Sequence, residues 1–240
     1  MLLSPAAERN KDALLQVLKD LLDTDRELFG LELGSGTGQH VIHFAQELPF
    51  VTWQPSEISS SAHESICSYI TATKLTNVLQ PVYLNIEDHW ENWAGLPKSS
   101  CDVVLCINLL HFCPFRTIQN IFKGAGELLK IGGLLLTYGV SHNAEKSLHF
   151  RNPEWGLPDT DVLRQLGYEN AMRLERMVRI VFKKCFSCLT FLCNRFVHLT
   201  ELKLKVCTST ASELFHLQFI VVMYRTKIRE KLSLSEYLWT

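Results

Sequence analysis

Apolar residues over roughly the first 140 positions alternate between helical spacing and short continuous runs, which predicts helices and strands in turn. A helix is expected after Ser4, which caps it, with Pro5 in its first turn. Further helices are expected over residues 39–48, 60–75 and 117–129, and strands over 29–33, 50–57, 78–86, 101–107 and 134–140. This order predicts an α/β protein with an open, doubly wound, mostly parallel sheet and helices on both faces.

Local features set the expected ends of some strands. Pro55 is expected to stop the second strand, because proline cannot extend a central ladder. Gly132 and Gly133 predict the turn before the fifth strand. The run 101–107 is almost continuously apolar, as expected for a central parallel strand that is covered on both faces.

The first strand leads into a glycine-rich segment, Leu-Glu-Leu-Gly-Ser-Gly-Thr-Gly-Gln-His, over residues 31–40. The dinucleotide-binding fingerprint has glycines at its first, third and sixth positions, whereas this loop has Gly34, Gly36 and Gly38, and Gln39 stands sixth. Glu32, two residues before the first glycine, would repel a pyrophosphate and favour a cationic ligand. A glycine turn alone is also an ordinary connection between a strand and a helix. As a ligand loop, this one favours S-adenosylmethionine, which carries a sulfonium and an ammonium and no phosphate, over NAD.

An acidic residue ends the second predicted strand. Glu57 lies 19 residues after Gly38, close to the interval of about 20 residues at which a doubly wound sheet places an acid on the ribose hydroxyls of its cofactor. A carboxylate suits a vicinal diol because it accepts hydrogen bonds from both hydroxyls. Strand, glycine loop, helix, strand and acid in this order predict a nucleoside-binding site.

The other candidate residues follow the remaining strands, because ligands of such sheets bind beyond the carboxyl ends of the strands. Asn85 and Ile86 are expected to flank an adenine, and Asn108 to contact the methionine end of the cofactor. Ser35, within the glycine loop, is grouped with the cofactor contacts. His111 is a candidate catalytic group facing the substrate, although a single histidine after a strand is more often a packing or solvent residue. Methyl transfer from a sulfonium needs mainly proximity and alignment, so the pattern identifies no base.

The composition narrows the class of protein. A length of 240 residues suits one α/β domain with a small appendage. A formal net charge of −1 gives no field that would attract nucleic acid or a membrane surface. The charge is unevenly distributed, because residues 1–177 hold 14 basic and 21 acidic side chains and residues 178–240 hold 10 and 4. We expect a small-molecule or protein substrate, and neither nucleic acid nor a membrane as partner.

Eight cysteines include one C-x-x-C pair, Cys185 and Cys188. Neither a second such pair nor a histidine pair stands at a spacing that would complete a zinc site, so no metal is expected. Cys101 and Cys106 fall in or beside a predicted buried strand and are expected to act as small hydrophobes. No secretory signal is visible, and no apolar stretch is long enough to span a bilayer. An intracellular protein, cytoplasmic or nuclear, is expected.

Several longer motifs carry a family resemblance. They are residues 4–11 (Ser-Pro-Ala-Ala-Glu-Arg-Asn-Lys), the glycine loop through His40, 53–57 (Trp-Gln-Pro-Ser-Glu), 75–78, 106–108, 138–139 and 151–157 (Arg-Asn-Pro-Glu-Trp-Gly-Leu). On these motifs the chain resembles the methyltransferase-like protein 26 family of class I S-adenosylmethionine-dependent methyltransferase-like proteins. The resemblance implies a Rossmann-like class I methyltransferase fold whose seven strands include an antiparallel final strand, and S-adenosyl-L-methionine as cofactor. It further implies cofactor contacts at the three glycines, Glu57 and the Asn85 loop, and residues 8–10 and 152–155 as elements that close over the pocket.

The chain departs from the family at three places. Glu57 and Asn85 stand where the family usually has aspartate, and the segment between Gly139 and Arg151 is shorter. The likeness ends at Met177. We therefore expect an S-adenosylmethionine-binding methyltransferase-like domain over residues 1–177, followed by an atypical basic segment, 178–240, that supplies the last strand or is poorly ordered. Three interpretations of this segment stay open: an alternative or mispredicted terminus, a substitute strand with 217–225 as best candidate, or a basic element for an acidic partner.

These observations favour one function and leave an alternative. The leading hypothesis is an S-adenosylmethionine-dependent methyltransferase with a small-molecule or protein acceptor. The alternative is a protein that binds the cofactor without catalysis, which the short segment before Arg151 and the altered terminus favour. An NAD-linked oxidoreductase is disfavoured by Gln39 and Glu32. Methylation of nucleic acid lacks support because residues 1–177 are acidic overall.

Overall fold

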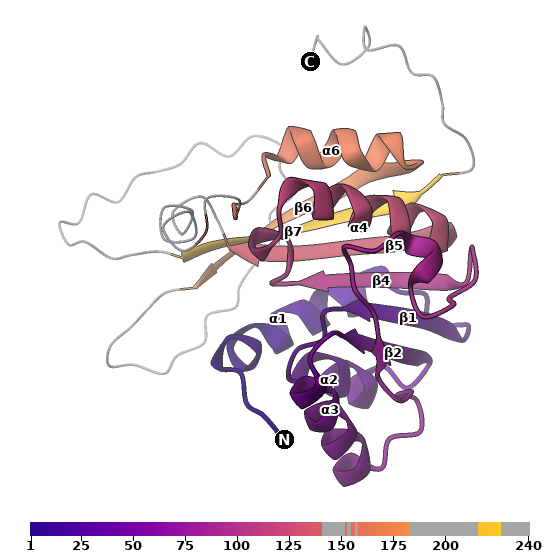
Figure 1. Cartoon of the computed structure of the whole chain (residues 1–240), viewed down its shortest axis with the longest axis vertical. Coiled ribbons are helices and arrows are strands. Elements are labelled where there is room, and N and C mark those ends of the chain that lie inside the picture. The colour runs from indigo at the N-terminus through magenta and orange to yellow at the C-terminus, as the bar shows by residue number, and fades with distance from the viewer. Residues whose placement is uncertain (141–151, 153–154, 157, 183–215, 227–240) are drawn as a thin grey trace, which may run out of the picture.

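The computed structural model describes residues 1–140, 152, 155–156, 158–182 and 216–226. These residues form a seven-stranded sheet with helices on both faces, and its strands lie in the order β3-β2-β1-β4-β5-β7-β6 (Figure 1). The strands are β1 (Leu28–Leu33), β2 (Val51–Glu57), β3 (Val82–Tyr83), β4 (Cys101–Ile107), β5 (Leu129–Val140), β6 (Met172–Phe182) and β7 (His216–Arg225). The helices are α1 (Pro5–Leu21), α2 (Gln39–Glu47), α3 (Ser60–Thr73), α4 (Phe115–Leu128) and α6 (Thr160–Glu169), with short 3-10 turns η1 (Trp90–Asn92) and η2 (Leu110–Phe112). The predicted α/β, Rossmann-like, mostly parallel fold is confirmed.

The sheet separates two apolar cores. Helices α1, α2 and α3 cover one face, and α4 and α6 cover the other (Figure 1). On the first face Phe44 of α2 meets the ring of the fully buried Trp53 of β2, with 6.0 Å between ring centroids. On the second face Phe122 of α4 lies in the same core as Trp93, which is also fully buried. Successive residues of β4 alternate between the two cores, which confirms it as a central strand.

Helix α1 begins as the sequence predicts. The Ser4 side chain accepts a hydrogen bond from the Ala7 amide at 3.3 Å, and Pro5 occupies the first helical position. Leu14 and Leu18 of this helix are buried in the first core. The cap and the apolar stripe together therefore fix where α1 starts and which side it turns to the sheet.

The prediction that Pro55 ends the second strand is wrong. Strand β2 continues through Pro55 and keeps its parallel register with β1. The amide of Trp53, two residues earlier, points to the β3 side, where it donates to a carbonyl oxygen, so the missing donor of Pro55 faces that side too. There the Gln54 side-chain amide donates to the Gln80 carbonyl at 2.8 Å. A side chain thus supplies the hydrogen bond that proline cannot.

The third strand is much shorter than the predicted span of 78–86. Strand β3 has two residues, and a separate bridge pairs Trp53 with Val78. Between the bridge and β3, the Gln54 amide bonds the Gln80 carbonyl, and Pro81 has no amide hydrogen to donate. The hydrogen-bond ladder between β2 and the segment 78–83 is therefore interrupted at residues 80–81. As a result, β3 is short.

Two other predicted boundaries shift. Helix α3 ends at Thr73 rather than near residue 75, because Lys74 adopts a left-handed conformation with φ 55°. Strand β5 already begins at Leu129, before the predicted glycine turn. A register shift between Cys101 and Val103 of β4 absorbs the intervening residues of β5, and Gly132 takes a φ of 78° there.

Two strands lie beyond the five that the hydrophobic pattern predicts. Strand β7 lies between β5 and β6 and runs antiparallel to both, with Tyr224 opposite Leu134. The sheet therefore has the seven strands and the antiparallel final strand that the family resemblance implies. Strand β7 nearly coincides with the candidate strand 217–225, so part of the basic segment belongs to the sheet. The shortened segment 141–151 and residues 183–215, with Cys185 and Cys188, lie outside the described residues.

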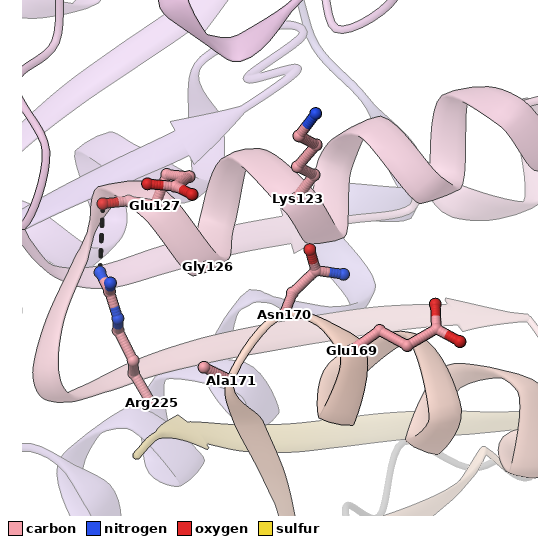
Figure 2. Close-up of a pocket in the computed structure, with 7 residues that line it drawn as sticks. All are labelled: Lys123, Gly126, Glu127, Glu169, Asn170, Ala171 and Arg225. Atoms are coloured by element: carbon pink, nitrogen blue, oxygen red, sulfur yellow. Dashed lines mark hydrogen bonds between the residues drawn. The ribbon is translucent and has the colours of Figure 1, made fainter. Parts of the chain in front are cut away.

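Arg225 fixes the end of β7 to the neighbouring elements. Its guanidinium donates to the Glu127 carbonyl at 3.1 Å (Figure 2) and also to the Leu129 carbonyl. These carbonyls lie at the carboxyl end of α4, where the last backbone acceptors of a helix have no partner within the helix. The next residue, Thr226, donates its amide to the Ala171 carbonyl at 2.9 Å. Arg225 thus joins β7 to α4 and to the start of β5.

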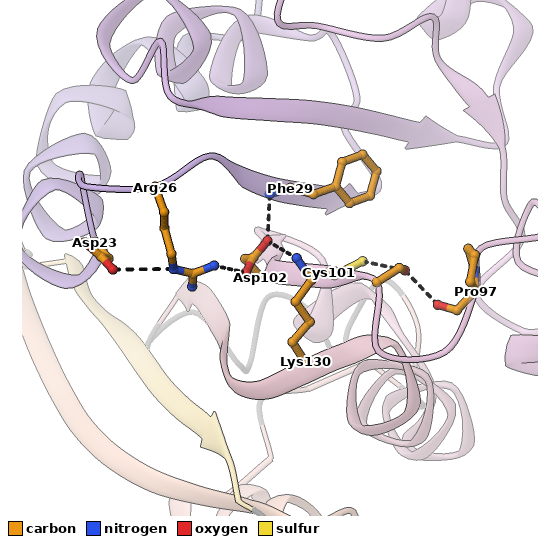
Figure 3. Close-up of polar contacts among 8 residues, drawn as sticks. Asp23, Arg26, Phe29, Pro97, Cys101, Asp102 and Lys130 are labelled. Atoms are coloured by element: carbon orange, nitrogen blue, oxygen red, sulfur yellow. Dashed lines mark hydrogen bonds and ion pairs between the residues drawn. The ribbon is translucent and has the colours of Figure 1, made fainter.

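Asp102 ties three strands together at their amino-terminal edge (Figure 3). Its buried carboxylate accepts hydrogen bonds from Arg26 and Lys130 at 2.7 Å each and from the Phe29 amide at 2.9 Å. Burial would raise the pKa of Asp102, but the hydrogen bonds from Lys130, Phe29 and Arg26 outweigh it and lower that pKa. The cluster lies at the edge opposite to the glycine loop, so its role is structural.

Candidate functional site

The predicted site residues come from the ends of four neighbouring strands. In register, Leu33 of β1 pairs with Ser56 of β2 and Cys106 of β4, and Glu57 of β2 pairs with Tyr83 of β3. All four strands are parallel, so their carboxyl ends meet at one edge of the sheet. The glycine loop, Glu57 and the segment after β4 therefore share that edge.

The three glycines of the loop have different roles. All have positive φ, at 64° for Gly34, 53° for Gly36 and 88° for Gly38. A Cβ atom on Gly38 would lie 2.9 Å from a side-chain carbon of Ile66 in α3, so Gly38 is needed for packing. A Cβ atom on Gly36 would meet nothing within 4 Å. The loop therefore offers open space at its middle glycine, where a ligand can approach the backbone.

Ser35 joins the loop to β2. Its amide donates to the Ser56 carbonyl at 2.9 Å, and its hydroxyl accepts from the Ser56 amide at 3.1 Å. The same hydroxyl donates to the Glu32 carbonyl at 3.3 Å, and Ser35 is buried. These bonds hold the loop in place, and a direct contact of Ser35 with a cofactor stays a prediction.

Glu32 is a buried acid with an oxygen that has no partner. Its side chain is 1% exposed, and Oε2 forms no hydrogen bond in the described part of the chain. Burial, together with the negative charge of Glu57, raises the pKa of Glu32 to about 8. An unpaired carboxylate is costly in such a place. The position therefore favours either a proton on Glu32 or a cation beside it.

Glu57 is oriented by backbone amides. Its Oε2 accepts from the Gly36 amide at 2.9 Å, and its Oε1 accepts from the Ile58 amide at 2.8 Å. Each carboxylate oxygen can accept more than one hydrogen bond, so both retain capacity for a ligand. The carboxylate predicted from sequence spacing thus lies directly against the middle glycine of the loop.

Asn85 and Ile86 follow β3 at the same edge of the sheet. The side chain of Asn85 closes a turn, because it accepts from the Glu87 amide at 3.1 Å and donates to Asp88 at 3.3 Å. Ile86 is partly buried against the second core. Their contact with an adenine stays a prediction, and the turn fixes the orientation in which Asn85 would meet it.

The segment after β4 contacts the glycine loop. Asn108 adopts an unusual positive φ of 53°, and its amide donates to the Tyr138 carbonyl at 2.8 Å. A Cβ atom built on Gly34 would lie 3.2 Å from the side chain of Leu109, so this segment contacts the loop. Asn108 therefore reaches the edge where its contact with the cofactor is predicted, and that contact stays a prediction.

His111 lies in η2 and is almost fully enclosed. Its side chain is 3% exposed, and its Nδ1 has no hydrogen-bond partner among the described residues. Burial lowers the pKa of His111 to about 4, so the imidazole is neutral near neutral pH. Its ring lies 4.3 Å from that of Phe112, which in turn meets Trp155 edge-on at 5.3 Å. Trp155 belongs to the predicted closing segment 152–155, of which residues 153–154 lie outside the described part.

Sequence reasoning missed the residues that tie α1 to the glycine loop. Gln39 drew attention only because it replaces a glycine, yet it is 8% exposed and its side chain donates to Glu8 at 3.3 Å. His40, next to it, is buried and meets Asn10 at 2.7 Å, and burial lowers its pKa to about 4. The sequence did contain a signal for these contacts: two adjacent polar residues, Gln39 and His40, stand at the start of an otherwise apolar helix face.

Two cavities lie beside α4 and α6. The smaller, of about 140 Å³, is lined by Lys123, Glu127, Glu169 and Arg225 among others (Figure 2). The larger, of about 370 Å³, lies between the two helices and includes Phe115. Neither contains a residue of the glycine loop. Within the described ranges no group of three or more His, Cys, Asp or Glu is placed to hold a metal ion, and no helix is long and apolar enough to cross a membrane.

Comparison with known proteins identifies the family. The model of a family described as "Protein of unknown function (DUF938)" matches residues 1–187. The chain belongs to the DUF938 family. The DUF938 match extends ten residues past Met177, where the likeness described in the sequence analysis ends.

The individual proteins that the chain resembles share only part of its sequence. The thiol S-methyltransferase TMT1B of Rattus norvegicus is 28% identical over 128 residues, which make up 53% of this chain and 49% of that protein. The chain thus matches about half the length of this curated relative. The YcgJ protein from Bacillus subtilis has a similar structure, with a TM-score of 0.63 at 12% identity, and the match covers 92% of this chain and 100% of that one. The TYW2 protein of M. jannaschii, in complex with AdoMet, has a TM-score of 0.54 at 14% identity and covers 94% of this chain and 78% of that one.

Proposed function

We propose that this DUF938 protein is an S-adenosylmethionine-dependent methyltransferase of the methyltransferase-like protein 26 type. The observation that carries the proposal is the buried Glu32, whose Oε2 lacks a partner in the described chain just before the glycine loop. The name of the TMT1B relative and the AdoMet bound to TYW2 support the same activity and cofactor. An intracellular site of action belongs to the proposal. So does the expectation of neither nucleic acid nor a membrane as partner, which the near-zero net charge supports.

The residues at the sheet edge fit S-adenosylmethionine group by group. Glu32 supplies a negative charge for the cationic methionine part, and the positive-φ glycines let that part approach the backbone. Glu57, held by the Gly36 amide, presents its carboxylate to the two ribose hydroxyls. We propose that Ile86 and Asn85 flank the adenine. A dinucleotide fits less well, because its pyrophosphate would approach the buried acid.

The chain contributes position and enclosure to the proposed reaction. The bound cofactor supplies an electrophilic methyl group, and transfer requires a nucleophile aligned with it. The aromatic cluster of His111, Phe112 and Trp155 lies beyond Leu109, which contacts the loop, and it forms the proposed wall on the acceptor side. The neutral His111 is the candidate group to take up a proton from the acceptor. The acceptor is a small molecule or a protein side chain.

Binding calorimetry tests the proposal. We expect the protein to bind S-adenosylmethionine and S-adenosylhomocysteine and not NAD. Failure of both nucleosides to bind at millimolar concentration would overturn the proposal, and so would a preference for NAD. Methyl release in the presence of small thiols, amines and proteins then identifies the acceptor.

Binding without catalysis is the second candidate function. The enclosure of His111, which is 3% exposed, favours it because an enclosed imidazole is hard for an acceptor to reach. A protein of this kind would bind S-adenosylhomocysteine and transfer no methyl group to any acceptor in a broad screen. Turnover with a single acceptor would rule it out.

A further inference from the structure

The amino-terminal residues lie against the glycine loop and α3. The Leu2 amide donates to the Ser65 hydroxyl at 2.7 Å, and the Tyr69 hydroxyl donates to the Leu2 carbonyl at 2.9 Å. Figure 1 places the N-terminus beside α2 and α3. We call residues 2–4 the strap. The strap precedes α1 and is held by side chains of α3 that are distant in the sequence.

Gln39 holds the other end of the strap. Its Oε1 accepts from the Ser4 amide, and its Nε2 donates to Glu8 of α1 at 3.3 Å. Both ends of the strap are therefore bonded through backbone amides, one to Ser65 and the other to Gln39. These contacts do not depend on the side chains of the strap, which are largely exposed.

Ser65 and Gln39 also hold one residue of the glycine loop. The Ser65 hydroxyl donates to the Thr37 carbonyl at 2.9 Å, and the Thr37 hydroxyl donates to Gln39 Oε1 at 3.1 Å. Thr37 lies between Gly36 and Gly38. Glycine has the widest backbone freedom of any residue, so a residue between two glycines needs contacts outside the loop to stay in one conformation. The strap and the loop share the two side chains that provide these contacts.

Burial makes these contacts hard to replace by water. Ser65 is 2% exposed and Gln39 is 8% exposed. Removing one partner would leave buried polar groups without hydrogen bonds, which is costly. A loop that is already fixed before a ligand arrives pays less conformational entropy on binding. The contacts are therefore placed to influence ligand affinity as well as stability.

We propose that Gln39 and Ser65 are positioning residues, which clamp Thr37 and the strap together and so hold the glycine loop ready for its ligand. This inference rests on the proposed function for the identity of the ligand. It also explains the departure from the dinucleotide fingerprint, because the sixth position needs a side chain that reaches the strap, whereas Gly38 meets the packing requirement against Ile66. Neither residue contacts the reacting atoms.

Three variants and a matched control test the proposal. Gln39→Ala and Ser65→Ala each remove contacts to the strap and to Thr37. Ser68→Ala is the control, because Ser68 lies on the same helix and its hydroxyl, among the residues that the structure describes, bonds only the Glu64 carbonyl, at 2.7 Å. The double variant Glu8→Gln with Gln39→Glu exchanges donor and acceptor between the two positions and so preserves their hydrogen bond. Calorimetry with S-adenosylhomocysteine gives affinity, thermal unfolding gives stability, and hydrogen exchange reports on residues 2–8 and 33–39.

The expected result separates affinity from stability. Gln39→Ala and Ser65→Ala should weaken binding about tenfold, the effect of losing one buried hydrogen-bonding group, and should speed exchange in both segments. Ser68→Ala should change neither, and the exchanged pair should recover most of the affinity. Unchanged affinity and exchange in Gln39→Ala and Ser65→Ala would overturn the inference, as would a loss of stability without faster local exchange. If the unmodified protein binds no S-adenosylhomocysteine, the proposed function fails, and hydrogen exchange alone then decides whether the clamp exists.

Discussion

The Gly36 amide donates a hydrogen bond to the Glu57 carboxylate at 2.9 Å, which joins the glycine loop to the end of β2. Glu57 thus serves two purposes. It fixes the middle of a glycine loop, and it keeps its remaining acceptor capacity for a ligand. Because Ile58 donates to the other carboxylate oxygen at 2.8 Å, the carboxylate orientation is set by backbone groups rather than by flexible side chains.

Glu57→Gln should weaken binding of S-adenosylhomocysteine about tenfold or more, because neutral acceptors make weaker hydrogen bonds than a carboxylate. Glu57→Asp keeps the charge and should stay within a few-fold of the unmodified protein. Calorimetry on the three proteins checks this, with thermal unfolding as a control for loop integrity. Equal affinities for the Gln and Asp variants would mean that the charge of Glu57 does not act on the ribose.

Glu32 should make the ligand-free protein less stable as pH rises. Its folded-state pKa of about 8 lies above the ordinary value of 4.5, so between these pH values the folded state holds a proton that the unfolded state has lost. The free energy of unfolding should therefore fall through this window, by up to about 1.4 kcal/mol per pH unit, and level off above it.

Glu32→Gln mimics the protonated acid and should remove this component of the pH dependence. Urea unfolding of both proteins across the window isolates it, because all other titrating groups are shared. A constant difference between the two proteins at every pH would show that Glu32 is ionised throughout.

Gly38 and Gly36 should respond differently to alanine. Gly38→Ala combines a φ of 88° with a Cβ atom 2.9 Å from Ile66, and should lower the free energy of unfolding by about 2–4 kcal/mol. Gly36→Ala meets no neighbouring atom within 4 Å and should cost only about 1–2 kcal/mol, from backbone strain. It should instead weaken cofactor binding. Denaturant unfolding and calorimetry on both variants separate the two effects, and equal loss of stability would contradict the assignment.

Arg225→Ala should lower the free energy of unfolding by about 1–2 kcal/mol, because the carbonyls of Glu127 and Leu129 lose a charged donor. Arg173→Ala is the control. Arg173 pairs at 2.9 Å with Glu175 on an exposed face of β6, so its loss should cost less than about 1 kcal/mol. Equal stability of the Arg225 variant and the control in urea would show that β7 does not depend on this anchor.

Local patterns predicted the central part of the fold. The cap at Ser4 and the apolar run of β4 are properties of neighbouring residues, and both are found where expected. The errors arise where distant groups decide the outcome. Strand β2 passes through Pro55 because the Gln54 side chain bonds Gln80, and β6 and β7 pair across residues 183–215. Neither of these contacts can be predicted from the spacing of residues in the sequence.

The candidate site likewise has some features that follow from the local sequence and others that depend on distant parts of the chain. The position of Glu57 follows from a count along the chain, because the helix between two parallel strands has a nearly constant length. The unpaired oxygen of Glu32 depends on burial by the whole sheet edge. The contacts of Gln39 depend on the strap, which is distant from it in the sequence. Sequence analysis therefore named candidate residues for the site, and the structure shows the contacts that hold several of them in place.

A crystal structure of the protein with S-adenosylhomocysteine tests the central claim most directly. We predict that the ribose hydroxyls lie within hydrogen-bonding distance of the Glu57 carboxylate, with the amino-acid part over Gly34 and Gly36 and its ammonium on the Glu32 side. Density for the nucleoside elsewhere, such as in the cavity of about 370 Å³ between α4 and α6, with an empty glycine loop would contradict the account.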